Sequence, residues 1–235
     1  MSGEIITPGA ADQGDAFAIF ATASPTLDTV RRLGRLFEWC EQQRGLRTKL
    51  DSKDPKHHKI AKARFTGIPD DHVLYGAERL FSAAELESAP EWWLHAAIGL
   101  TFDSLSNGKK VSPNVRAGIV DSMLFDQAVH AGYDPGFSAP VIVEMAREVR
   151  RTTKEYLPMP AKILELCAES RARFARRRVI TSLLMGIRQT AEDLLIETGE
   201  VKVGDDDEYE FKPDEALQQW LSGQRPVPLL SSSTG

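Results

Sequence analysis

The sequence predicts an all-α protein, a multi-helix array, with one small β-hairpin near residues 200–211. Two observations predict this fold class. Apolar residues recur at spacings of three and four through most of the chain, which is the period of a helix face. Ser or Pro stands at the start of four such segments and Gly at their ends, as helix termini prefer. Capping and period therefore indicate the same structure.

The first half of the chain contains the least regular segments. Residues 1–24 are rich in Gly, Ala, Ser, Thr and Asp, and we expect a flexible N-terminal arm. Ser24 and Pro25 then predict the start of the first helix. Lysines dominate residues 48–62, which predicts a solvated loop that ends in a short helix. Another short helix is expected from Ser82 to Ser88.

Longer helices are expected further along. Pro90 opens one that ends at Asn107-Gly108, Ser112-Pro113 opens the next, and Ser138-Ala139-Pro140 a third. After the break Leu157-Pro158-Met159-Pro160, apolar spacing predicts one long helix, bent or broken near Arg176 or Gly186, whose polar middle protrudes.

The period changes near residue 200, where apolar and polar residues alternate on both sides of Gly204-Asp205-Asp206-Asp207, which predicts the hairpin. A last helix is expected from Asp214 to Leu221. The domain organisation that follows has four parts, namely the arm at 1–24, a helical domain at 25–198, the hairpin with the short helix at 199–223 and a flexible tail at 224–235.

Composition limits the classes of function. The chain has 235 residues, a formal net charge of −5 and a pI near 5.6, which argues against a generally basic nucleic-acid-binding protein. Two cysteines in helix-like segments make a disulfide framework improbable and favour a cytoplasmic protein. No apolar run reaches the roughly 20 residues that a membrane span needs, so no membrane partner is expected.

The strongest functional signal is a local density of arginine. Five arginines fall within eight residues of the expected long helix, and guanidinium groups on a helix could bind phosphates or acidic side chains. Basic residues before the break could extend this surface if the two helices fold back as a hairpin. The alternative is a solvated face, paired in part with nearby carboxylates. The candidate binding residues are Arg147, Arg150, Arg151, Lys154, Arg171, Arg173, Arg176, Arg177 and Arg178.

A metal site is the competing signal. Glu91 with His95, and Asp126 with His130, form two carboxylate–histidine pairs at helical spacing i, i+4, and two such helices could face each other around a metal ion. Helical di-metal sites use a different, i, i+3 motif, so surface ion pairs are the alternative explanation. No cofactor is expected.

Aromatic, histidine and cysteine residues indicate structural roles. In the Trp92-Trp93 pair, at least one ring is expected in the core and the other at an edge. His57-His58 is interpreted as part of a solvated loop, and so is Asp70-Asp71-His72. Phosphate-binding loops and nucleophile motifs are absent, which favours a protein without enzymatic activity.

Residues 147–174 resemble phage and prophage replication accessory proteins, including helicase loaders. The resemblance consists of a basic helix, the break that carries Tyr156, Leu157, Pro158 and Pro160, and a second helix with Ala161, Ile163 and Leu164. It implies a non-enzymatic adaptor of phage-like DNA replication, of the kind without ATPase activity. Its partner would be a protein such as a replicative helicase, or DNA. A metal-dependent enzyme and a structural interaction module, which could form homo-oligomers, remain the alternatives.

Overall fold

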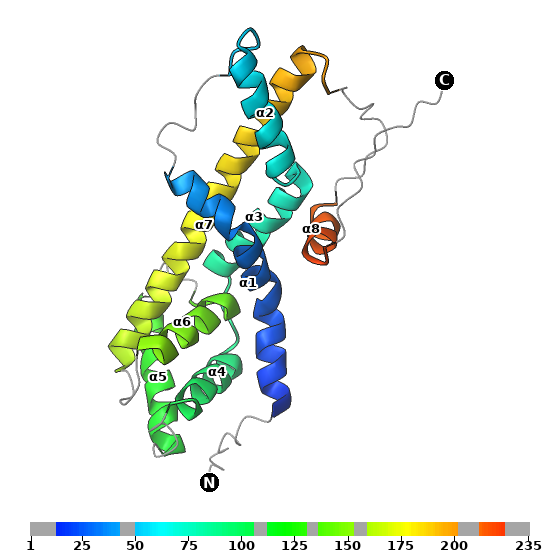
Figure 1. Cartoon of the computed structure of the whole chain (residues 1–235). Helices are drawn as coiled ribbons and strands as arrows, with labels where there is room; N and C mark the ends of the chain where they lie inside the picture. Colours follow the sequence, from blue (N-terminus) through cyan, green and yellow to red (C-terminus); the bar gives the residue numbers. More distant parts are fainter. Residues whose placement is uncertain are drawn as a thin grey trace. The chain divides into compact units, whose positions relative to one another are not determined.

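The structure, a computed structural model, describes residues 13–42, 50–105, 112–130, 136–152, 159–201 and 212–223. Within these ranges the backbone alone is described at 13–20, 91, 113 and 123–130. The described residues form eight α-helices and no strand (Figure 1). In chain order these are α1 (Gln13–Gln42), α2 (Pro55–Gly67), α3 (Asp71–Leu86), α4 (Glu91–Asp103), α5 (Pro113–His130), α6 (Ala139–Thr152), α7 (Pro160–Glu197) and α8 (Pro213–Leu221). The predicted predominantly helical class is confirmed.

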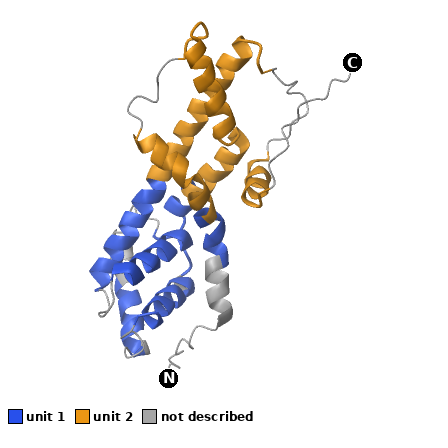
Figure 2. Cartoon of the chain, viewed as in Figure 1, with its two compact units in different colours: residues 1–27, 82–175 blue, residues 28–81, 176–235 orange. Residues whose placement is uncertain are grey.

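Figure 2 shows that the chain divides into two compact units. Unit 1 consists of Met1–Leu27 and Ser82–Ala175, and unit 2 of Asp28–Phe81 and Arg176–Gly235. The divisions fall within α1, α3 and α7, so each of these helices supplies residues to both units. Residues 25–198, which the sequence assigns to one helical domain, are therefore shared between two cores.

Unit 1 is built around α6. Its apolar positions Val141, Ile142, Met145 and Val149 are almost completely buried, at 1% exposure or less. Their spacing leaves the opposite face for polar residues. Helix α4 packs against both α5 and α6. The hydroxyl of Ser138, just before α6, donates a buried 2.6 Å hydrogen bond to the α3 carbonyl of Ala84, which fixes the start of the helix.

Unit 2 joins α2 and α8 to parts of α1, α3 and α7. The rings of Phe37 in α1 and Phe81 in α3 pack edge to face, with centroids 5.9 Å apart. A separate apolar cluster joins α2 to the end of α7, and Val201 packs against it. The buried members of this α2–α7 cluster are Ala61, Ala191, Leu194 and Leu195.

Two helix boundaries differ from the sequence predictions. Helix α1 begins at Gln13, not near Ser24, and Pro25 lies inside it. The alanine-rich segment before Pro25 favours helix, and Ala23 is completely buried, so packing outweighs the hydrogen bond that proline removes. Helix α3 begins at Asp71 rather than at Ser82, because the Asp70 carboxylate accepts a 2.9 Å hydrogen bond from the Val73 amide and caps it.

The β-hairpin is not supported. Residues 202–211 lie outside the described part of the chain, and so do residues 224–235 of the expected tail. Of the expected hairpin, Glu200 and Val201 are described, and both donate their backbone N–H groups to the carbonyl of Leu195, at 2.8 and 3.1 Å. This 195–201 contact is a helix-end turn.

The long helix expected after the proline break is present. Helix α7 is continuous over 38 residues, without the expected interruption at Arg176 or Gly186. Trp93 is 3% exposed and Trp92 59%, so the expectation of one core ring and one edge ring is confirmed. None of the helices in the described ranges combines the length and apolar composition needed to cross a bilayer.

Candidate partner-binding surface

Basic residues project from the last turns of α6. Arg147, Arg150 and Arg151 are all exposed, because α6 buries its apolar face in unit 1. Arg151 is held by a two-point contact with Glu148 in the preceding turn, at 2.7 and 3.1 Å. This contact lowers the pKa of Glu148 and raises that of Arg151. Lys154, the fourth basic residue expected here, lies outside the described residues.

The first half of α7 adds further basic groups to unit 1. Lys162 pairs with Glu165 one turn later, at 2.8 Å. The exposed Arg173 donates a 3.3 Å hydrogen bond to the buried Ser170 hydroxyl. The guanidinium of Arg171 lies 5.5 Å from the ring centroid of Phe137, the residue two before α6. Arg171 is therefore engaged within the protein through a cation–π contact.

One contact joins the segment before α6 to the first half of α7. Phe137, before α6, meets Arg171, which lies late in this half of α7. Near the end of α6, the positive charges of Arg173 and Lys162 both contribute to the lowered pKa of Glu148. Arg147, Arg150 and Arg151 belong to the same unit as Arg171 and Arg173. We call the exposed residues Arg147, Arg150, Arg151, Lys162 and Arg173 the basic surface of unit 1.

The second half of the arginine cluster belongs to unit 2, since the division falls after Ala175. Arg176 forms a 2.8 Å ion pair with Glu41 of α1. Arg177 and Arg178 are half-buried and take part in contacts within the protein. The expectation of a protruding polar middle in this helix is wrong for one face, because Ser170, Phe174 and Thr181 are completely buried. The five arginines consequently do not form one free cationic rod.

The candidate metal residues are brought only partly together. Helices α4 and α5 are linked by His95 Nε2 and Asp121 Oδ1, 3.8 Å apart, and by a 2.7 Å ion pair between Arg116 and Asp103. The side chains of Glu91, Asp126 and His130 lie outside the described residues. Among the side chains that are described, no group of three or more potential ligands is found.

The two cysteines are buried and poorly suited to nucleophilic chemistry. Burial raises the pKa of Cys40 to about 11 and that of Cys167 to about 12. A thiol in such surroundings stays protonated near neutral pH, and the thiolate is the reactive form. Both residues therefore belong to the core, as their apolar helix faces predicted.

Sequence reasoning missed two polar residues of unit 2 that join separate segments. Arg188 of α7 donates hydrogen bonds to the carbonyls of Phe65 and Ile68, and His58 of α2 contacts Glu200 after α7. The only signal for Arg188 was a charged residue beside Ile187 in an apolar stretch. His58 was interpreted as part of a solvated loop, but it lies in α2, and its partner Glu200 is 142 residues away in the sequence.

Comparison of the chain with protein-family models, with curated proteins and with solved structures finds no match in any of the three.

Proposed function

We propose that this chain is a non-enzymatic adaptor that binds an acidic face of a protein partner through the basic surface of unit 1. The observation that carries the proposal is the exposure of Arg147 and Arg150 on α6 and of Arg173 on the part of α7 that belongs to the same unit. Arginine suits this role, because its planar guanidinium can bind a carboxylate through two hydrogen bonds.

Carboxylates within the same surface favour a protein over DNA. Glu148 and Glu165 are paired to Arg151 and Lys162, and the exposed Glu169 lies on the same stretch of α7. A phosphate backbone would be repelled by these groups, and the net charge of −5 adds no long-range attraction to DNA. A protein partner can instead match alternating charges, which sets orientation and specificity.

The resemblance of residues 147–174 to helicase loaders suggests the partner. We place the adaptor in phage-like DNA replication, with a replicative helicase as the first candidate. No bond chemistry is needed for such a role, and association would depend on charge and shape complementarity.

The test is a binding measurement on the full chain with purified replicative helicase and with single- and double-stranded DNA, at about 50 and about 200 mM salt. The test variant is Arg147→Glu with Arg150→Glu. A matched control is Arg31→Glu with Arg35→Glu, two exposed arginines on α1. The proposal is supported if the α6 variant loses binding to the helicase while the α1 control keeps it. Salt-sensitive DNA binding lost in the same variant would identify nucleic acid as the partner and overturn it.

A further inference from the structure

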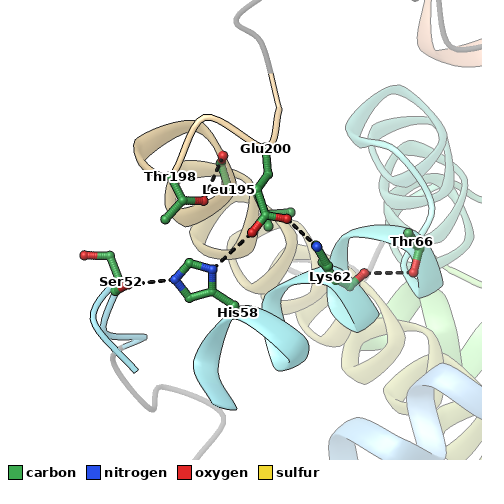
Figure 3. A network of polar contacts seen from close by, with 7 residues as sticks. All are labelled: Ser52, His58, Lys62, Thr66, Leu195, Thr198 and Glu200. Carbon is green, nitrogen blue, oxygen red and sulfur yellow. Dashed lines mark hydrogen bonds and ion pairs between the residues drawn. The ribbon is translucent and has the colours of Figure 1, made fainter. Parts of the chain in front are cut away.

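Both ring nitrogens of His58 face hydrogen-bond acceptors (Figure 3). Nδ1 lies 3.1 Å from Oε1 of Glu200, which follows α7. Nε2 lies 2.7 Å from the backbone carbonyl oxygen of Ser52, in the segment before α2. A neutral imidazole carries one N–H group, whereas the imidazolium carries two. Only the protonated ring can therefore donate to both partners at once.

The alternative placement of the proton, on Glu200, is disfavoured by Lys62. Its ammonium group contacts the other carboxylate oxygen of Glu200, so the carboxylate is held in its ionised form. The pKa of Glu200 is accordingly lowered, by Lys62 first and His58 second. The pKa of His58 is raised, chiefly by the Ser52 carbonyl and then by Glu200, while burial and Lys62 oppose the shift.

The other charged groups near His58 either join the same two segments or hold the start of α2. Glu197 of α7 accepts a 2.9 Å hydrogen bond from the Ser52 hydroxyl, which adds a second contact between the same two segments. Asp51 lies before α2. Asp54 caps the helix, because its carboxylate accepts a 2.8 Å hydrogen bond from the Lys56 amide. The neighbouring His57 makes a different contact, because its Nδ1 accepts a 2.9 Å hydrogen bond from the Asp51 amide.

We propose that protonated His58 is a pH-sensitive latch that fastens the segment after α7 to the start of α2. The latch lies next to the α2–α7 cluster, because Val201, which follows Glu200, packs against that cluster. Loss of the His58 proton leaves one ring nitrogen facing an acceptor, so Glu200 or Ser52 must move away. Deprotonation then loosens the segment that carries Val201, which keeps the Lys62 contact and the backbone hydrogen bonds to Leu195 as its other attachments.

The latch works in a defined pH window. The raised pKa of His58 means that its contribution is complete below about 6.5, the unfolded value, and is lost as pH rises through the folded value. The lowered pKa of Glu200 means that its contribution is complete above about 4.3 and is lost as pH falls through its folded value. The latch is thus fully closed between these limits and opens on the alkaline side.

Two measurements on the full chain test the latch. Nuclear magnetic resonance gives the pKa of the His58 ring, with its signal identified by its loss in His58→Gln. Amide hydrogen exchange at Glu200 and Val201, corrected for the intrinsic effect of pH, reports whether the segment stays attached. We expect His58 to titrate above about 6.5. The protection of both amides should fall over that titration, by about tenfold for each unit of pKa shift.

Variants separate the latch from a general effect of pH. Glu200→Gln should lower the pKa of His58, and Lys62→Gln should raise it, because Lys62 opposes the charge on the ring. His57→Gln is the matched control and should leave the pH dependence of both amides intact. A His58 pKa at or below about 6.5, or one unchanged by Glu200→Gln, would overturn the proposal. Amide protection that stays constant over the His58 titration would also overturn the proposal.

Discussion

Arg188 of α7 lies with its guanidinium carbon 4.3 Å from the ring centroid of Phe65 while its Nη1 donates a hydrogen bond to the carbonyl oxygen of the same residue. A second bond runs to Ile68 at 3.3 Å. These carbonyls belong to the end of α2 and the residue after it, where the helix itself supplies no donors. One side chain of α7 thus terminates α2 and covers an aromatic ring.

Replacing Arg188 should therefore destabilise unit 2. The side chain is 13% exposed, and Arg188→Leu removes both hydrogen bonds and the cation that faces Asp71 at 4.0 Å. We expect a loss of about 2–4 kcal/mol in the free energy of unfolding, measured by urea denaturation. Arg188→Lys keeps the charge but not the planar fork, so it should recover only part of the loss. If Arg188→Leu lowered the free energy of unfolding by less than about 0.5 kcal/mol, the contacts of Arg188 would contribute little to stability.

Gly76 of α3 should not tolerate a side chain. A Cβ atom there would lie 2.6 Å from the carbonyl oxygen of Pro213 and 2.9 Å from Cβ of Leu217, so α8 would have to shift. We expect Gly76→Ala to cost about 1–3 kcal/mol and to change the fluorescence of Trp220, which sits on α8 beside Arg32.

The same substitution at Gly186 provides the control for Gly76. This residue lies inside α7, and a Cβ atom added there would meet no neighbouring group within 4 Å. Ala is the better helix former, so Gly186→Ala should stabilise the protein by about 0.5–1 kcal/mol. If Gly76→Ala and Gly186→Ala changed the free energy of unfolding equally, the close approach of α8 to Gly76 would be contradicted.

The sequence predicted α4, α5, α6 and α8 well, because cap residues and apolar spacing agree at each of them. It failed where one signal was misleading. Pro25 resembles a helix start, yet α1 continues through it because neighbouring residues such as Ala23 are buried. Asp70 resembles a loop residue, yet it caps α3. Local patterns cannot show which residues tertiary packing will bury.

The candidate surface was predicted only in part, for a related reason. Arginine density identified α6 and α7, but the partners of Arg171 and Arg176 come from other segments. Glu41 forms an ion pair with Arg176, more than a hundred residues away in the sequence, and the guanidinium of Arg171 lies over the ring of Phe137. Such contacts depend on the fold, so composition alone could not separate exposed from engaged arginines.

Both cysteines should resist thiol reagents in the native protein. Because burial raises the pKa of Cys40 to about 11 and of Cys167 to about 12, neither forms thiolate near pH 8. Labelling with a coloured disulfide reagent should be slow until urea unfolds the chain. Above pH 9.0, the ordinary value here, the unfolded state loses thiol protons first, so each cysteine makes stability fall by about 1.4 kcal/mol per pH unit until its folded pKa is reached. Fast labelling of folded protein at pH 8 would refute this.

Replacing Phe174 tests whether this turn of α7 is packed in a core or protrudes into solvent. The side chain is completely buried in the middle of the arginine cluster, so Phe174→Ala leaves a cavity in unit 1. We expect a loss of about 3–5 kcal/mol in the free energy of unfolding. The adjacent Arg173 is exposed and donates only a 3.3 Å hydrogen bond, so Arg173→Ala should change stability by less than about 0.5 kcal/mol. If Phe174→Ala were as mild as Arg173→Ala, this turn of α7 would stand in solvent rather than in the core of unit 1.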